Sequence, residues 1–199
     1  MILPRAFYAR DTVTVARELL GQMLVHGETA GVIVETEAYL GHDDSGRDDL
    51  AAHSAAGITP RTSVIFGEPG HAYVYLSYGR HWCLNIVTEA NGQPGCILLR
   101  ALEPVAGLDI MRHRRPACRR DHELASGPGN LARAMGISKA HYGADLTYGA
   151  LTVRAGRVHD PAIVITPRIG ITRSEALPLR FFIRGNPSVS GKNHLPKNF

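Results

Sequence analysis

Apolar and polar residues alternate along several short stretches of the chain, the pattern of strands that place one face against a core. Strands are predicted at residues 22–26, 30–40, 71–77, 82–87, 95–101, 151–154, 162–166 and 180–184. Glycine-containing turns separate most of them, as at Gly27 and at Asn91-Gly92. Short strands joined by tight turns predict a curved, mainly antiparallel sheet.

Helical periodicity is confined to a few segments. Residues 12–20 carry an apolar face, with Asp11 or Thr12 as the candidate cap and Gly21 as the stop. Residues 104–113 are predicted to be helical, and a third helix is expected to open at Pro128 and end at Gly136. The pattern favours an α+β fold: one compact domain over residues 1–190 with peripheral helices, and residues 191–199 as a flexible tail.

One predicted strand carries an unusual polar face. In residues 32–40, VIVETEAYL, the side chains of Val32, Val34 and Ala38 are expected to face the core, which leaves Glu35 on the other side. If the neighbouring strands share one sheet, the same alternation places further side chains together on its polar face: Glu37, Tyr39, Tyr73, Tyr75, Asn85 and Arg100.

This polar face has two interpretations. A strand face exposed to water can carry tyrosine and charged residues without any further role. The alternative is a binding site, favoured by three tyrosines within six positions, Tyr73, Tyr75 and Tyr78. Tyrosine rings stack on nucleobases, and a carboxylate beside them can act as a general base. The residues therefore indicate a pocket for a flat, base-like ring with an acid/base group.

Composition narrows the class of protein. The formal net charge is +4 and the pI about 9.1, which permits an anionic partner such as nucleic acid. Cys83, Cys96 and Cys118 are widely spaced, so a reducing compartment is expected rather than a disulfide framework. Neither a secretory leader nor a long apolar run is seen, which predicts an intracellular protein with no membrane association: cytoplasm or nucleoid, or nucleus in a eukaryote.

Several motifs, in order, resemble one known family. They are ETEAYLG (35–41), AAHS (51–54), YVYLSYG (73–79), LLRALEP (98–104), SGPGNL (126–131) and PLRFFIRGNPSVS (178–190). Each motif alone is weak, but the ordered set covers nearly the whole chain. It is similar to the vertebrate-type alkyladenine, or 3-methyladenine, DNA glycosylases, which are distinct from the helix-hairpin-helix glycosylases.

The resemblance implies an activity and a partner. A member of this family would excise alkylated or deaminated purines from double-stranded DNA. It would extrude the nucleotide and hydrolyse the N-glycosidic bond. The expected protein is a monomer without metal or other cofactor. No lysine belongs to the predicted pocket, so no Schiff-base step is expected and the product would be an intact abasic site.

The resemblance also implies roles for individual residues. Glu37 resembles the general base, and Arg100 the partner that orients the attacking water or a phosphate. Tyr78 resembles the side chain that intercalates into the duplex. The base pocket is expected to be formed by Tyr39, His53 and Tyr75 as stacking rings, by Asn85 against the amine of guanine, and by Tyr73 and Leu98. Contacts to the DNA backbone are expected from Arg80, His81, Ser126 and Gly127.

Two alternatives to a glycosylase remain open. A loop rich in aspartate, residues 41–52, together with His53 contains six candidate metal ligands and could indicate a metal-dependent nuclease. Its spacing matches no defined motif, and the loop is longer and more acidic than is typical of the resembled family. A damaged-DNA-binding protein without catalysis would also use basic residues and tyrosine wedges. The basic run at residues 112–120 would suit either a phosphate contact or a solvated helix end.

Overall fold

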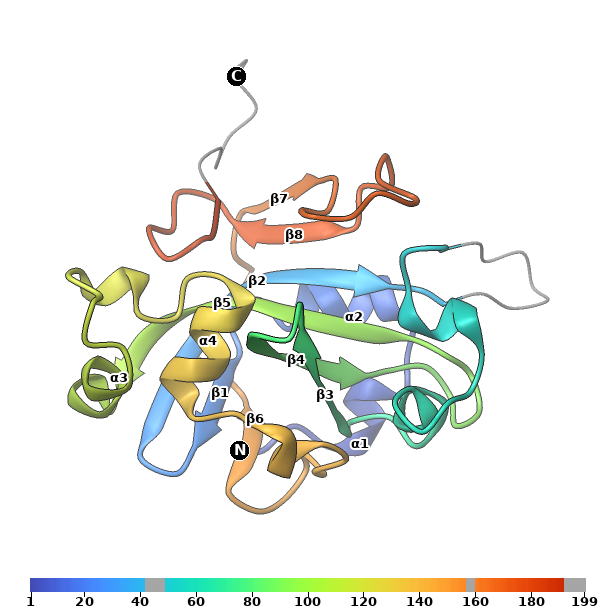
Figure 1. Cartoon of the computed structure of the whole chain (residues 1–199), viewed down its shortest axis with the longest axis horizontal. Helices are drawn as coiled ribbons and strands as arrows, with labels where there is room; N and C mark the ends of the chain where they lie inside the picture. The colour runs from blue at the N-terminus through green and yellow to red at the C-terminus, as the bar shows by residue number, and fades with distance from the viewer. Residues whose placement is uncertain (42–48, 157–159, 192–199) are drawn as a thin grey trace.

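The computed structural model describes residues 1–41, 49–156 and 160–191 (Figure 1). Over this part the strands are β1 (Met23–His26), β2 (Thr29–Tyr39), β3 (Ala72–Ser77), β4 (His81–Val87), β5 (Cys96–Ala106), β6 (Leu151–Arg154), β7 (Ile163–Thr166) and β8 (Arg180–Ile183). The α-helices are α1 (Arg5–Tyr8), α2 (Thr12–Glu18), α3 (Leu108–Arg114) and α4 (Pro128–Met135). Short 3₁₀ turns are η1 (His53–Ala56), η2 (Ser63–Phe66), η3 (Asp121–Glu123) and η4 (Lys139–His141).

The strands form one antiparallel sheet in the order β3-β4-β5-β2-β1-β6. The two long central strands, β2 and β5, pair along most of their length. Beyond the end of β1, β2 takes a different partner on the same side, β8, which in turn pairs with β7. The predicted α+β class with a curved antiparallel sheet and peripheral helices is confirmed (Figure 1). The predicted tail falls almost wholly on residues 192–199, which lie outside the described part of the chain.

The main core lies between the sheet and the helices. Ala16 of α2, Ile33 and Ala38 of β2, and Leu131 of α4 are all fully buried in it. α2 begins as predicted, because Oδ1 of Asp11 accepts a hydrogen bond from the backbone N–H of Thr14 at 2.8 Å. α4 also begins and ends where the sequence predicts, with Gly136 in the left-handed conformation after its last residue.

The helix predicted over residues 104–113 is wrong at its start. Pro104 pairs with Gly31 and lies inside β5, which continues to Ala106. Gly107 then turns the chain with φ of 67°, and α3 begins only at Leu108. Proline has no N–H to donate, and it is accommodated here next to a register irregularity between Ala30 and Gly31.

A bulge in β2 changes the faces predicted for residues 32–40. The register with β5 shifts between Ile33 and Glu35, and again between Glu35 and Thr36. Ile33 therefore packs in the main core, whereas Val32 and Val34 pack beneath Phe182 of β8. The prediction that the two valines share a face with Ala38 is wrong, because strict alternation does not pass through a bulge. The bulge also turns Glu35 toward β8.

Besides the main core and the group around Val34 and Phe182, a small apolar cluster lies where β3, β4 and β5 meet. Ile65, Tyr73, Val87 and Cys96 are its buried members, and the rings of Tyr39 and Tyr75 pack against it. Aromatic side chains of the candidate site pack against this cluster.

Candidate active site

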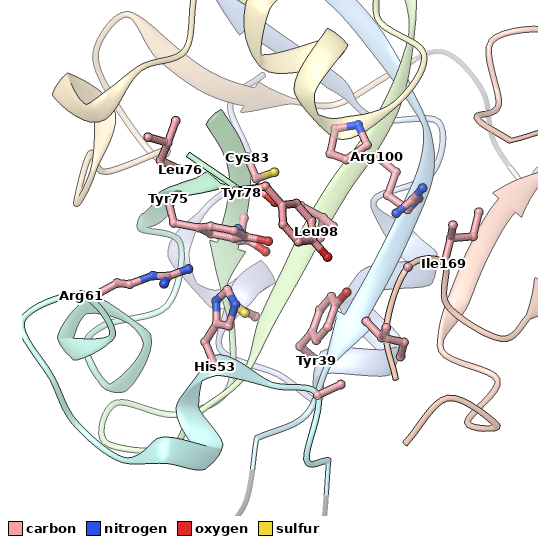
Figure 2. A pocket seen from close by; sticks show the side chains of 17 residues that line it. Tyr39, His53, Arg61, Tyr75, Leu76, Tyr78, Cys83, Leu98, Arg100 and Ile169 are labelled. Carbon is pink, nitrogen blue, oxygen red and sulfur yellow. The ribbon is translucent and has the colours of Figure 1, made fainter. Parts of the chain in front are cut away.

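A cavity of about 430 Å³ opens on the polar side of the central strands (Figure 2). Its wall includes seven of the predicted site residues: Tyr39, His53, Tyr75, Tyr78, Asn85, Leu98 and Arg100. They come from β2, from η1, from the β3–β4 hairpin and from β5, four parts of the chain that the sheet brings together. The volume lies within the range of about 300–1,000 Å³ typical of small-molecule pockets.

Aromatic rings line one side of the cavity. The ring centroids of His53 and Tyr75 lie 4.6 Å apart at an interplanar angle of 81°. Tyr73 stacks on Tyr75 from beneath at 5.4 Å and 29°. Figure 2 shows the rings of Tyr39, His53 and Tyr75 gathered around one space. Such a space bounded by rings suits a flat aromatic ligand.

His53 is held in the neutral form by its surroundings. Burial, followed by the charge of Arg61, lowers the pKa of His53 to about 4. Burial raises the pKa of Tyr73 to about 12, so its hydroxyl keeps its proton. The hydroxyl lies 2.9 Å from Nδ1 of His53, to which it can donate. A neutral imidazole with one nitrogen so engaged presents its ring to the cavity without adding a positive charge.

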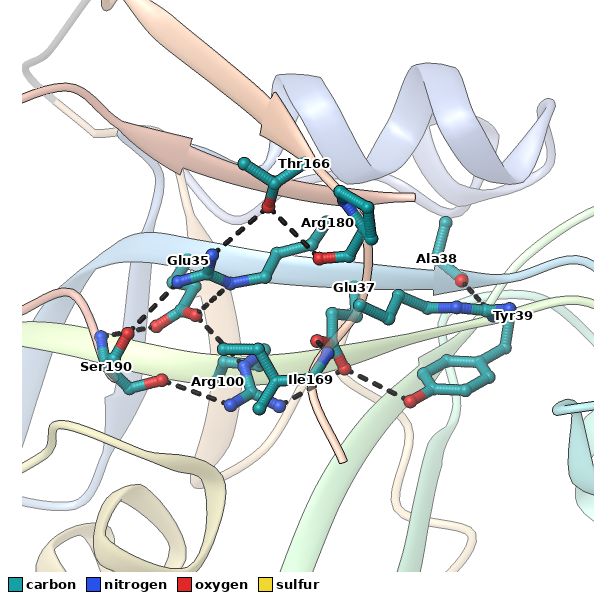
Figure 3. A network of polar contacts seen from close by, with 11 residues as sticks. Glu35, Glu37, Ala38, Tyr39, Arg100, Thr166, Ile169, Arg180 and Ser190 are labelled. Carbon is teal, nitrogen blue, oxygen red and sulfur yellow. Dashed lines mark hydrogen bonds and ion pairs between the residues drawn. The ribbon is translucent and has the colours of Figure 1, made fainter. Parts of the chain in front are cut away.

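Glu37 lies behind the wall of the cavity and is fully buried. Its carboxylate is held by three residues that do line the cavity (Figure 3). Oε2 accepts hydrogen bonds from the Tyr39 hydroxyl at 3.1 Å and from Nη1 of Arg100 at 3.2 Å. Oε1 accepts one from the backbone N–H of Ile169 at 2.8 Å. Burial and Glu37 both raise the pKa of Tyr39, which therefore remains a donor.

Glu35, two residues earlier, forms a buried brace with different partners (Figure 3). Oε1 accepts from Nε of Arg180 at 2.6 Å and from Nε of Arg100 at 3.0 Å. Oε2 accepts from the backbone N–H of Ser190 at 2.7 Å, and the Ser190 hydroxyl in turn lies 3.2 Å from Nη2 of Arg100. All three guanidinium nitrogens of Arg100 therefore donate hydrogen bonds. Burial acts to lower the pKa of Arg100, but Glu37 and Glu35 outweigh it and hold the pKa above its usual value.

Tyr78 projects from a tight turn at the rim of the cavity. Its side chain is 91% exposed, the highest value among the large aromatic residues of the described chain. Tyr78 and Gly79 both have positive φ, 48° and 66°, and the N–H of Arg80 donates to the carbonyl of Ser77 at 3.0 Å. Left-handed backbone at both central positions indicates a type I′ hairpin turn. The exposed ring is thus carried on a short, hydrogen-bonded tip.

Comparison with known proteins identifies the family to which this arrangement belongs. Residues 6–187 match the family described as methylpurine-DNA glycosylase. The chain belongs to the methylpurine-DNA glycosylase family. Membership makes it a DNA glycosylase, a hydrolytic enzyme that acts on alkylated bases, and not a member of the helix-hairpin-helix fold.

Relatives of similar length support the family assignment. A protein of Methanoculleus marisnigri is 51% identical, with 96% of this chain and 99% of the relative covered. Proteins of Koribacter versatilis, 47% identical over 97% of this chain and 95% of the relative, and Carboxydothermus hydrogenoformans, 44% identical over 96% and 100%, are also similar. All three names assign the relatives provisionally as 3-methyladenine DNA glycosylases.

Not every predicted site residue of this glycosylase lines the cavity. Glu37 and Tyr73 lie directly behind it, in contact with residues of the wall. Asn85 lines it, with its amide nitrogen donating to the carbonyl of Tyr73 at 3.1 Å, and Leu98 is its partner on the neighbouring strand. Arg80, His81, Ser126 and Gly127 lie outside it, and their predicted contacts with DNA stay predictions.

Some residues of the wall were not expected from the sequence. Arg61 places its guanidinium 4.9 Å from the centroid of the Tyr75 ring. Ile169 and Gly170 line the cavity from the segment between β7 and β8. Arg61 follows a polar loop without periodicity, and Ile169 holds Glu37 through its backbone, so neither leaves a pattern in the sequence. Cys83 and Cys96 also line it, and burial raises the pKa of both thiols.

Asp49, at the end of the acidic loop, forms a buried ion pair with an arginine. Both carboxylate oxygens of Asp49 pair with Arg168, at 2.6 and 2.7 Å, and the Arg168 guanidinium lies 4.5 Å from the Tyr39 ring. Over residues 1–41, 49–156 and 160–191, no cluster of three or more histidine, cysteine, aspartate or glutamate side chains is placed to hold a metal. Residues 42–48, which hold the rest of the candidate ligands, lie outside the described part of the chain.

Two arginines of the basic run on and after α3 form ion pairs: Arg112 with Asp109 and Asp121, and Arg120 with Glu123. The run is therefore not a continuous patch of unpaired charge. Among the helices that the structure describes, none combines the length and apolar character that a membrane span requires.

Proposed function

We propose that this enzyme excises alkylated or deaminated purines from double-stranded DNA by drawing the nucleotide into the aromatic cavity and hydrolysing its N-glycosidic bond. The observation that carries the proposal is the position of Glu37. A buried carboxylate stands directly behind a cavity walled by aromatic rings, and it is oriented by Arg100, Tyr39 and the backbone of Ile169.

Stacking would select the extruded base. Tyr39, His53 and Tyr75 offer ring faces or edges around one space, and base–aromatic stacking contributes about 1–3 kcal/mol per base. Extruding a nucleotide costs a few kcal/mol, and it costs least where the base is damaged and its pairing is weak. A cavity of this kind therefore selects lesions partly because weakly paired nucleotides are easier to extrude. Alkylated purines with a positive charge on the ring would also be attracted to electron-rich tyrosine faces.

Tyr78 would fill the space that the extruded nucleotide leaves. Its ring is exposed at the rim of the same cavity and is carried by a tight type I′ turn. A ring inserted between base pairs holds the duplex open while the nucleotide is in the pocket.

The chemical step would use Glu37 as the general base. An ionised carboxylate has about four acceptor sites, and three are engaged by described residues, which leaves one acceptor site for a water. That water would attack the anomeric carbon of the sugar and give a proton to Glu37, while the bond to the base breaks and its electron pair departs with the base. The negative charge also stabilises the positive charge that develops on the sugar.

The reaction would end at an abasic site. The walls of the cavity include no lysine from the described residues, and a Schiff-base step requires an amine nucleophile. We expect the enzyme to act as a monomer, inside the cell where its DNA substrate lies, and to retain activity in the presence of a chelator. Covalent trapping of purified enzyme on DNA by borohydride, with strand cleavage, would contradict the monofunctional mechanism.

Substitution of Glu37 by glutamine tests the proposal. Glu37→Gln should keep binding to a lesion-containing duplex and lower the single-turnover rate of base release by roughly 10²–10⁴-fold, the usual contribution of a general base. Glu103→Gln is the matched control, because Glu103 lies exposed on β5 with Asn186 as its partner. Circular dichroism and thermal unfolding would confirm that both variants are folded.

The same experiment separates the glycosylase from its alternatives. The substrates are duplexes that each hold one lesion: 3-methyladenine, 7-methylguanine, hypoxanthine or ethenoadenine. If the wild-type protein binds them all and releases no base, it is a damaged-DNA-binding protein. If chelation abolishes an activity that cleaves the strand, the metal-dependent nuclease is correct.

A further inference from the structure

A second cavity, of about 530 Å³, lies on the other side of the Tyr78 turn. The β3–β4 hairpin contributes Arg80, His81 and Trp82 to it, and α4 with the residues that follow contributes Arg133 and Ile137. Arg114, at the end of α3, completes its basic lining. Three arginines and a histidine therefore surround one space, and no carboxylate of the described chain lines it.

These arginines differ from Arg112 and Arg120 because none of them has an acidic partner in the described part of the chain. Arg112 and Arg120 are engaged in ion pairs, as described above. Arg80, Arg114 and Arg133 form no ion pair with any carboxylate of residues 1–41, 49–156 and 160–191. Arg80 and Arg133 are exposed, so their charge is available to a ligand from solution.

Glycines let the hairpin and the helices approach closely enough to form this space. A Cβ on Gly129 would come within 2.8 Å of Cβ of His81, so glycine allows α4 to pack against the hairpin. A Cβ on Gly136 would come within 2.9 Å of the guanidinium carbon of Arg114, which also donates from Nη1 to the carbonyl of Ala134 at 2.9 Å. Arg114 is thus fixed in place at the edge of the cavity.

The two cavities share their dividing wall. Ser77 and Tyr78 line the first and Arg80 and His81 the second, so the turn between β3 and β4 separates them. The start of α4 does the same, with Pro128 in the first cavity and Gly129 in the second. A strand of DNA whose nucleotide enters the first cavity past Tyr78 would carry its neighbouring phosphates toward this wall.

We propose that the basic cavity between the β3–β4 hairpin and α4 binds backbone phosphates of the DNA beside the extruded nucleotide, through Arg80 and Arg133 with Arg114 and His81 behind them. The inference rests on the proposed function for the identity of the ligand. It goes beyond that function by placing a phosphate-binding site on α3 and α4, outside the base pocket. Such contacts add affinity and register without reading the sequence.

The salt dependence of DNA binding tests this site. The logarithm of the binding constant falls linearly with the logarithm of salt concentration, with a slope of about 0.9 for each phosphate neutralised. The double variant Arg80→Gln/Arg133→Gln should lower the magnitude of that slope by about two, on undamaged and on lesion-containing duplexes alike. Fluorescence anisotropy of a labelled duplex measures it, and Arg133→Gln alone should give about half the change.

A matched control removes the same charge elsewhere. Arg17 lies on α2 and Arg154 lies on β6, at the sheet edge farthest from β3 in strand order, and neither residue lines either cavity. Arg17→Gln/Arg154→Gln should leave the slope unchanged. Equal slopes for the two double variants would overturn the proposal, as would weakened binding with an unaltered slope.

The only tryptophan of the chain supplies a second readout. Trp82 is half-buried and lines the basic cavity, so binding of undamaged duplex should change its emission in the wild type and in the control variant. The change should be lost in Arg80→Gln/Arg133→Gln. Specific competition by inorganic phosphate, at matched ionic strength, would instead identify a site for a small free anion and overturn the assignment to DNA. Because none of these measurements requires base release, they remain decisive if the proposed catalysis fails.

Discussion

Two glutamates of the same strand differ in role because their neighbours differ. Glu35 accepts from two arginines and a backbone N–H, and of these partners only Arg100 lines the cavity. Glu37 accepts from one arginine, one tyrosine and a backbone N–H, and each of these residues borders the cavity. The contacts of Glu35 therefore give it a structural role, whereas catalysis by Glu37 is the proposal that remains to be tested.

At the same scale, the charge of Arg61 adds to burial in lowering the pKa of His53. Replacing Arg61 by glutamine removes a positive charge that disfavours the imidazolium, so the pKa of His53 should rise from about 4. It should stay below the ordinary value of 6.5, since burial is the larger cause of the shift and remains. Titration of the imidazole followed by NMR measures the change, with Arg17→Gln as a distant control. A pKa that falls or does not move would show that Arg61 does not act on His53.

At the scale of elements, the bulge in β2 and the β7–β8 hairpin together build the polar network. The bulge turns Glu35 toward β8, where Arg180 and Ser190 meet it, and the segment after β7 brings Ile169 to Glu37. The β7–β8 hairpin therefore carries residues that orient both Arg100 and Glu37, although it lies at the edge of the sheet (Figure 3).

Removing one member of this brace should destabilise the fold. Arg180 is 3% exposed and pairs with the fully buried Glu35. Arg180→Gln therefore removes one of the two arginines that pair with that carboxylate. Loss of one partner of a buried pair typically costs about 3–5 kcal/mol. Chemical denaturation should show a loss of this order, whereas Arg112→Gln, which breaks surface pairs, should change the midpoint little. Equal losses in the two variants would contradict the importance of the buried brace.

At the scale of the whole molecule, contacts between distant parts of the chain hold the site together. The hydrogen bond from Ile169 to Glu37 spans 132 residues, and that from Ser190 to Glu35 spans 155. We expect the folded part of residues 1–190 to unfold in one cooperative transition. Trp82 fluorescence and far-ultraviolet circular dichroism should therefore give coincident curves. Two separated transitions would show that the β7–β8 hairpin is an independent unit and would contradict a single domain.

The sequence by itself determined much of the local structure of this glycosylase and the aromatic part of the cavity wall. Alternation, caps and glycine turns depend on neighbours a few residues away, so they predicted most of the strands, α2, α4 and the polar face with Tyr39, Tyr75 and Asn85. Resemblance of ordered motifs supplied His53 and Tyr78.

Tertiary structure alone decided what depends on distant or backbone contacts. No periodic pattern in the sequence marks the bulge that separates Val34 from Ala38. The same is true of the hydrogen bond from Ile169 to Glu37 and of the contact between Arg61 and the ring of Tyr75. The basic cavity is of the same kind, because it forms only where α3, α4 and a hairpin meet, and charge along the chain does not reveal which arginines are paired.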